Sequence, residues 1–194
     1  MASVNQMLQS GSYVNDVTGS RDFSYYDDMV IAAAVGTTTL FRNPIGVGGK
    51  TLADTNMVTA GILPSTQKLT VRAIKVFYAT VDAFATADLQ AFYTMLRSTT
   101  FELQVSNKPV DIQLNLMELF GISLAAAFTP TVAGDNLPMI LPRFHGIFPL
   151  NRPIVLQGNV QFEVRMSHWV APGAGLVGDF LFISLNGDLD SSIG

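Results

Sequence analysis

The chain has 194 residues and a formal net charge of −4, and 13% of its residues are charged, about half the usual quarter. It contains no cysteine and two histidines, which excludes a disulfide scaffold, an iron–sulfur centre and a thiol nucleophile. The length suits one domain with a full hydrophobic core.

The N-terminal segment, residues 1–22, is polar and contains neither Lys nor Arg before Arg21. We interpret this segment as an extended arm that orders, if at all, on a neighbouring molecule. The rest of the chain, residues 23–194, is expected to form a single β-sandwich domain.

The first strand-like stretches are residues 29–35 and, after a break at Gly36, the β-prone residues 37–42. A Gly/Pro-rich loop, residues 43–50, follows them. Polar and apolar residues alternate from Leu69 and then become apolar on both faces, which predicts a long, buried strand over 69–81.

One helix is predicted, over residues 86–98. Thr86 is a good N-cap, Asp88 lies in the first turn and Arg97 in the last, where their charges complement the helix dipole. The apolar residues have helical spacing and predict a buried face formed by Leu89, Phe92, Met95 and Leu96.

A hairpin is predicted next, because residues 101–106 and 110–115 alternate strictly around the turn Asn107-Lys108-Pro109. The apolar run 119–128 fits a buried strand, although a helix is also compatible with it. Residues 129–153 hold five of the nine prolines and are interpreted as a long connection.

Two closing strands are predicted, over residues 154–166 and 180–185. Strands therefore dominate, one helix interrupts them, and helices do not alternate with strands as in a doubly wound sheet. The predicted fold is all-β, an antiparallel two-sheet sandwich. The long excursions between strands favour the jelly-roll form.

Two glycine motifs resemble nucleotide-binding sequences. Gly49-Lys50-Thr51 looks like the end of a phosphate-binding loop, but that motif requires glycine where this chain has Pro44. Residues 173–178 match G-x-G-x-x-G, yet they precede a predicted strand rather than a helix. We interpret the first motif as a flexible loop and the second as a turn between strands.

Metal and catalytic motifs are equally weak. Asn186, Asp188 and Asp190 alternate as at the start of a calcium loop, but no glutamate follows to complete it; a frayed, solvated terminus is the preferred interpretation. His145 and His168 are 23 residues apart and form no metal-binding pattern. No nucleophile elbow exists, so no catalytic, cofactor or metal residue is predicted, and the protein is not expected to be an enzyme.

Aromatic residues suggest a binding surface of another kind. Trp169, with Phe144 and Phe148, could form a sugar-stacking platform, but packing in the core or at an interface is preferred. The residues that we predict to form subunit contacts are Met7, Leu8, Phe120, Phe128, Met139, Ile140, Phe148 and Trp169.

The mean hydropathy of +0.34 is high, so we expect part of the apolar surface to be covered by a membrane or by other subunits. No apolar run approaches the 18 residues of a membrane-spanning helix, and residues 1–11 lack the features of a signal peptide. We therefore expect contacts between subunits to cover this apolar surface. The eleven Lys and Arg residues are scattered singly, so direct nucleic-acid binding is not expected.

The order of these elements resembles that of the single jelly-roll major capsid proteins of tailless icosahedral bacteriophages, a lineage that includes membrane-containing virions. The resemblance covers residues 29–186 and is architectural: an uncharged arm, the strand 69–81, the helix 86–97, the hairpin through Asn107-Lys108-Pro109, a proline-rich excursion and two closing strands. It implies a coat subunit without catalytic residues or cofactors, and a location in the virion.

The leading hypothesis is a coat protein that assembles with copies of itself, and with other virion proteins, into a shell. A lipid layer beneath such a shell would agree with the absence of a basic arm. The alternative hypothesis is a carbohydrate- or receptor-binding β-sandwich, such as a spike or fibre head. No small-molecule substrate is expected under the first hypothesis.

Overall fold

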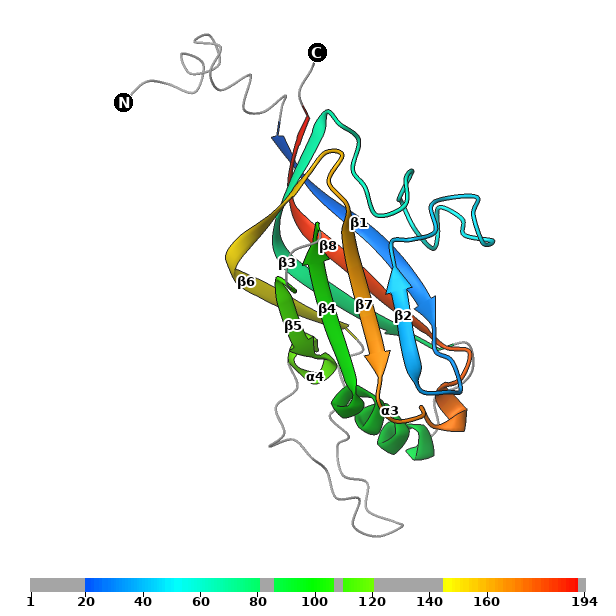
Figure 1. The fold of residues 1–194 in the computed structure, drawn as a ribbon. Helices are drawn as coiled ribbons and strands as arrows, with labels where there is room; N and C mark the ends of the chain where they lie inside the picture. Colours follow the sequence, from blue (N-terminus) through cyan, green and yellow to red (C-terminus); the bar gives the residue numbers. More distant parts are fainter. Residues whose placement is uncertain (1–19, 81–85, 107–109, 121–144, 192–194) are drawn as a thin grey trace, which may run out of the picture.

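The computed structural model describes residues 20–80, 86–106, 110–120 and 145–191. These residues form an antiparallel sandwich of two four-stranded sheets (Figure 1), which confirms the predicted all-β, two-sheet class. The strands are β1 (Ser20–Val30), β2 (Gly36–Leu40), β3 (Gln67–Ala79), β4 (Thr99–Val105), β5 (Ile112–Asn115), β6 (His145–Gln157), β7 (Phe162–His168) and β8 (Phe180–Ser191).

Each sheet contains strands from both halves of the chain. The β1 sheet has the order β1-β8-β3-β6, and the β2 sheet has the order β2-β7-β4-β5. Within the described strands, only β4 and β5 follow one another in the same sheet, and every other step along the chain moves from one sheet to the other. Edge strands of different sheets, β1 and β2, therefore lie on the same side of the sandwich.

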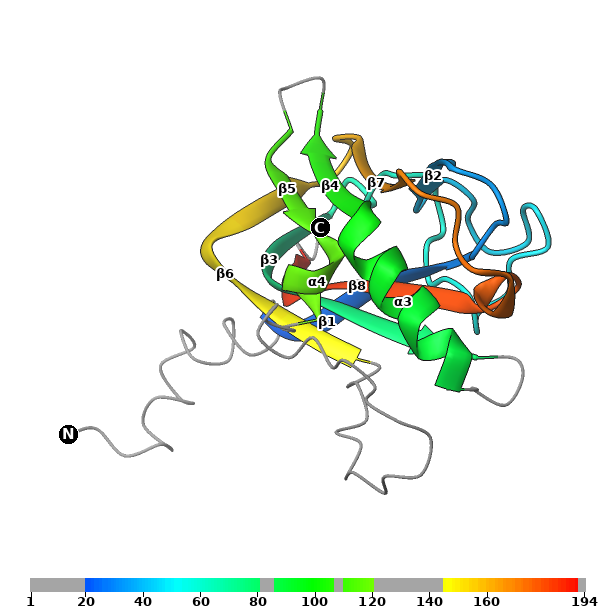
Figure 2. The ribbon, with the colours of Figure 1, turned by 90° about the horizontal axis from the view of Figure 1, so that it is seen from below.

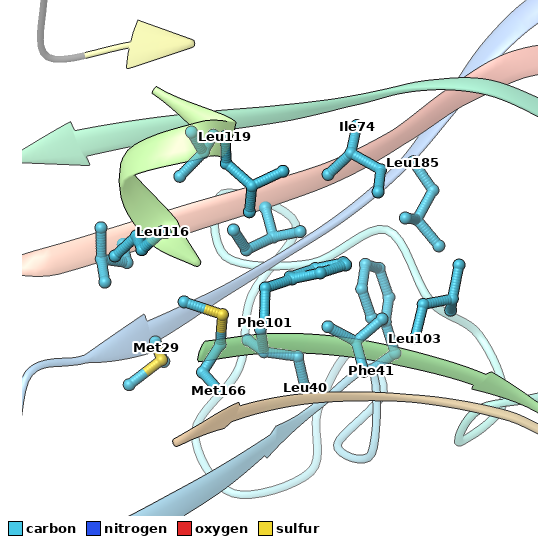
Figure 3. Close-up of a cluster of buried hydrophobic side chains, with 14 of the residues drawn as sticks. Met29, Leu40, Phe41, Ile74, Phe101, Leu103, Leu116, Leu119, Met166 and Leu185 are labelled. Carbon is cyan, nitrogen blue, oxygen red and sulfur yellow. The ribbon is translucent and has the colours of Figure 1, made fainter. Parts of the chain in front are cut away.

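The core lies between the sheets. Side chains of a β-strand point alternately to its two faces. The residues of β3 that point into the core and are buried are Leu69, Val71, Ile74, Val76 and Tyr78. Figure 3 shows Ile74 and Leu185 from one sheet facing Phe101 and Leu103 from the other. Burial of this apolar surface is the main term that holds the sheets together.

The predicted helix is confirmed as α3 (Thr86–Ser98), which lies across one end of the sandwich (Figure 2). Its buried face consists of Phe92, Met95 and Leu96, whereas Leu89, which was predicted to share this face, is half-buried. A short second helix, α4 (Leu116–Leu119), starts at a capping box between Asn115 and Glu118. The run 119–128 is not a strand at its start, because Leu119 ends α4 and Phe120 is its C-cap; residues 121–128 lie outside the described residues.

Two predicted boundaries in the second half are wrong. Pro149 and Pro153 belong to β6 rather than to a connection, because β6 is an edge strand and needs no backbone donor on its free side. The stretch 154–166, predicted as a single strand, contains the end of β6 and most of β7. These two strands lie in different sheets. Asn159 adopts a positive φ of 61° in the turn between them.

The chain ends of the fold also differ from the prediction. Strand β1 begins at Ser20, inside the predicted arm, while residues 1–19 lie outside the described residues. Strand β8 continues through Gly187 to Ser191 instead of ending near residue 185. A β-bulge makes this continuation possible: the register shifts between Val71 and Ala73 of β3, and Gly187 lies opposite it.

Candidate functional site

The outer face of the β2 sheet is polar throughout its described strands. Pairs of side chains across the strands satisfy one another, such as Thr37 with Ser167 (2.8 Å between hydroxyl oxygens) and Gln113 Nε2 with Glu102 Oε1 (2.9 Å). Arg165 donates to both carboxylate oxygens of Glu163, at 2.9 and 3.0 Å. This face is therefore suited to solvent.

The outer face of the β1 sheet is divided into two halves. Near the start of β3 and the end of β8 it carries ion pairs between the two strands: Lys68 with Asp190, at 2.9 Å, and Arg72 with Asp188. The carboxylates that resembled the start of a calcium loop thus belong to a strand and face cations. The interpretation of residues 186–190 as a frayed terminus is wrong.

The other half of this face carries a cluster of apolar side chains, with Asp28 and Lys75 beside it. We call it the aromatic patch, and it consists of Val30, Phe77, Ile147, Phe180 and Phe182. Adjacent ring centroids are 6.1 Å apart for Phe77 and Phe182 and 6.2 Å apart for Phe180 and Phe182. Ile147, Val30 and Phe77 are 59%, 53% and 48% exposed.

Strand register places the aromatic patch on four neighbouring strands. Phe77 lies opposite Phe182, and Phe180 lies opposite Val30. Ile147 lies opposite Lys75, whose cation forms no ion pair with any described residue. A solvent-facing sheet normally alternates apolar and polar faces, so this half of the β1 sheet has the composition of a surface that another molecule covers.

The free edge of β1 is covered by the chain that follows β2. Asn56 accepts from the backbone N–H of Tyr26 (2.9 Å) and donates to the carbonyl of Ser24 (2.8 Å), while Thr55 donates to the carbonyl of Tyr26 (3.0 Å). These contacts occupy backbone groups that would otherwise be open to another strand. Growth by strand addition at β1 is therefore blocked.

Lys50 completes the cover over this edge. Its Nζ atom lies 3.0 Å from Asp27 Oδ1, contacts Asp28 Oδ1 and donates to the Asp28 carbonyl at 2.5 Å. Asp27 also accepts from the backbone N–H of Phe41 at 2.5 Å, so this carboxylate in β1 contacts the chain just after β2. A groove of about 310 Å³ adjoins the cluster.

Burial sets the protonation behaviour of this cluster. Burial raises the pKa of Asp27, although the hydrogen bonds from Phe41 and Lys50 act in the opposite direction. Burial lowers the pKa of Lys50, but its hydrogen bonds to Asp28 and Asp27 outweigh that effect and leave the pKa raised. Burial and the contacts between the groups thus raise the pKa of both Asp27 and Lys50.

The structure accounts for the Gly49-Lys50-Thr51 motif without a nucleotide. The Lys50 ammonium is engaged by Asp27 and Asp28, and turns rather than a helix follow it. The loop 43–50 is held by hydrogen bonds, such as Gly46 N–H to the Lys50 carbonyl (2.8 Å). The predicted loop is thus confirmed, and its flexibility stays a prediction.

The G-x-G-x-x-G motif is a turn between β7 and β8, as predicted. It contains the 3₁₀ turn η2 (Ala174–Leu176), which contacts α3. A Cβ atom at Gly175 would lie 1.8 Å from Asp88 Oδ1, so a side chain there would displace the Asp88 carboxylate.

The two histidines lie at the ends of strands that belong to different sheets. His145 is the first residue of β6, whereas His168 is the last residue of β7 and is buried. The Nδ1 atom of His168 lies 2.7 Å from the Thr99 hydroxyl, and burial lowers the pKa of the imidazole. No group of three or more His, Asp or Glu residues in the described part of the chain could hold a metal ion.

The predicted contact residues divide into three groups. Phe120 is 3% exposed and packs against Phe92, with ring centroids 5.7 Å apart, so it is a core residue and its predicted role is wrong. Phe148 is half-buried against the core, and Trp169 is 68% exposed. Met7, Leu8, Phe128, Met139 and Ile140 lie outside the described residues, as does Phe144 of the predicted aromatic platform.

Sequence reasoning missed both the aromatic patch and the Lys50 cluster. The signal for the patch was the alternation of Phe180 and Phe182 with Leu181 and Ile183, which places large apolar residues on both faces of one strand. The signal for the cluster was the adjacent pair Asp27-Asp28 directly before the apolar residues Met29 and Val30.

No protein-family model matches this sequence, and no curated protein matches it either. Among the described residues, no helix has both the length and the apolar character that crossing a membrane requires.

Proposed function

We propose that this protein is a structural subunit that assembles with copies of itself into a shell, as a viral coat protein located in the virion. The observation that carries the proposal is the contrast between the two outer faces. One face is polar and internally hydrogen-bonded, and the other bears the aromatic patch. Obligate interfaces between subunits have the apolar character of the second face.

The strand order supports a jelly roll. That fold wraps two Greek keys into two four-stranded sheets, and such wrapping makes successive strands alternate between sheets, as they do here outside the β4–β5 hairpin. The covered edge of β1 further supports assembly through faces and loops rather than through strand addition.

The size of the aromatic patch favours a lattice over an isolated dimer. Aromatic and branched side chains with these exposures leave on the order of 300 Å² of apolar surface. That is well below the roughly 800 Å² that each partner buries in a standard interface. A closed lattice compensates for small contacts, because releasing one subunit breaks several of them together.

The test is to place a charge in the aromatic patch. We expect Ile147→Lys to abolish large assemblies seen by light scattering and negative-stain microscopy, because it places a cation among apolar groups and opposite the cation of Lys75. Gln157→Lys is the matched control, since Gln157 lies on the same strand and face but opposite Lys68, which pairs with Asp190. Equal assembly by Ile147→Lys, Gln157→Lys and the wild type would contradict the proposal.

The carbohydrate-binding alternative is favoured by one observation, the exposed indole of Trp169. Its Nε1 donates to the Thr100 hydroxyl at 3.2 Å, which leaves the ring face open for stacking. Under this alternative the protein would form a small closed oligomer that binds glycans, and Trp169→Ala would abolish glycan binding. Under the coat proposal, we expect the protein to bind no glycan specifically when it is tested on a glycan array.

A further inference from the structure

The cluster at the β1 edge joins the groups that an amide bond between side chains requires. Lys50 supplies a primary amine and Asp28 a carboxyl group, and the two are in direct contact. Asp27 supplies a second carboxyl group, with Oδ1 3.0 Å from the same Nζ atom. The Asp27 and Asp28 side chains are almost completely buried and that of Lys50 is mostly so.

We propose that Lys50 and Asp28 form an intramolecular isopeptide cross-link, with Asp27 as the proton-transfer residue. The link would join β1 to the loop that follows β2, and it would close a ring that contains all of β2. This inference concerns a covalent modification within one chain and does not depend on whether the protein forms a shell.

The reaction is a condensation in which no electrons are gained or lost. Lys50 begins as an ammonium and Asp28 as a carboxylate. A proton passes from Nζ to Asp27, and the neutral amine attacks Cγ of Asp28. The new N–Cγ bond forms, one C–O bond of Asp28 breaks, and that oxygen leaves as water with two protons that came from Nζ. Asp27 relays both protons and returns to its starting state.

Asp27 is placed to accept the proton, although the hydrogen bonds that raise the pKa of Lys50 oppose its loss. Burial makes Asp27 a better proton acceptor than an exposed carboxylate, because its pKa is raised. The Phe41 N–H holds Asp27 Oδ2 at 2.5 Å, so Oδ1 remains directed at Lys50. The Asp28 carbonyl accepts a further hydrogen bond from Nζ at 2.5 Å and keeps the amine beside its own side chain. The adjoining groove gives the released water a route to solvent.

Other charged groups near the cluster do not compete for these roles. Asp54 also lines the groove, but its carboxylate accepts from the backbone N–H and hydroxyl of Thr51 at 2.7 and 2.8 Å. Those hydrogen bonds lower the pKa of Asp54, which makes it a poor proton acceptor. Asp54→Asn is therefore a matched control for Asp27→Asn.

The experiment is the intact mass of the purified, folded full-length chain. We expect a mass lower than the sequence mass by one water. A tryptic digest should contain residues 22–42 joined to residues 43–68, with no cleavage after Lys50. Lys50→Arg should restore the full mass while retaining a cation. Asp28→Asn should lose one ammonia instead of one water, because its leaving group differs.

Asp27→Asn should leave most of the chain at full mass, while Asp54→Asn should be cross-linked like the wild type. Circular dichroism confirms that each variant is folded before its mass is interpreted. Folded wild-type protein at the full sequence mass, with normal cleavage after Lys50, would overturn the inference and leave an ordinary ion pair. Loss of water that persists in Lys50→Arg would also overturn it.

Discussion

The phenol of Tyr78 donates a hydrogen bond to the carboxylate of Asp179 in the buried interior, across 101 residues of sequence. Tyr78 is the last inward-facing residue of β3, and Asp179 immediately precedes β8. The backbone of Asp179 also accepts from the N–H of Ile31 at 2.8 Å. One polar residue therefore connects the ends of three neighbouring strands, β1, β8 and β3.

Removing the Tyr78 hydroxyl should destabilise the fold. Tyr78→Phe leaves the Asp179 carboxylate buried without that donor, and we expect it to lower the free energy of unfolding by about 1–3 kcal/mol. The measurement is urea unfolding. Tyr25→Phe is the control, because its hydroxyl bonds to the half-buried Gln67 and water can replace it. If both variants lose the same stability, the Tyr78 bond has no special role.

The buried His168 should make stability depend on pH. Burial lowers its pKa from the ordinary value of 6.5, so the unfolded chain binds a proton more readily than the folded one. Stability from this group is complete above pH 6.5 and is lost as the pH falls below that value, by up to about 1.4 kcal/mol per pH unit.

The check is the difference in unfolding free energy between the wild type and His168→Asn, measured from pH 7.5 to pH 5. Asparagine can still bond to Thr99 but does not titrate. The wild type should lose more stability on acidification than the variant does. Parallel pH profiles for the two proteins would show that His168 does not titrate in this way.

Gly187 should not accept a side chain. A Cβ atom there would lie 1.8 Å from the carbonyl oxygen of Thr70, a backbone atom that cannot rotate away. We expect Gly187→Ala to destabilise by about 1–3 kcal/mol. Gly36→Ala is the control, since a Cβ at Gly36 meets nothing within 4 Å. Thermal unfolding of both variants tests this, and equal midpoints would be inconsistent with the observed bulge.

Local patterns predicted the elements whose structure is decided locally. Helix α3 follows from the spacing of Phe92, Met95 and Leu96, and the two-sheet class follows from strands that alternate over short stretches. The β4–β5 pairing follows from matched alternation on the two sides of one turn. In each case the residues that determine the structure are close in sequence.

Other features could not be predicted because distant residues determine them. Asn186-Gly187 resembles a turn, but the bulge in β3 lets β8 continue through it. Pro149 and Pro153 resemble loop residues until β6 is known to be an edge strand. Lys50 resembles a phosphate ligand until the loop places it beside Asp27 and Asp28. Sequence spacing contains none of these long-range relations.

Sedimentation velocity of the wild-type protein over a wide concentration range tests self-association most directly. We predict a concentration-dependent shift from the 20.9 kDa chain to large, discrete particles. A single 20.9 kDa species that persists to millimolar concentration would contradict the proposal that copies of this chain cover the aromatic patch.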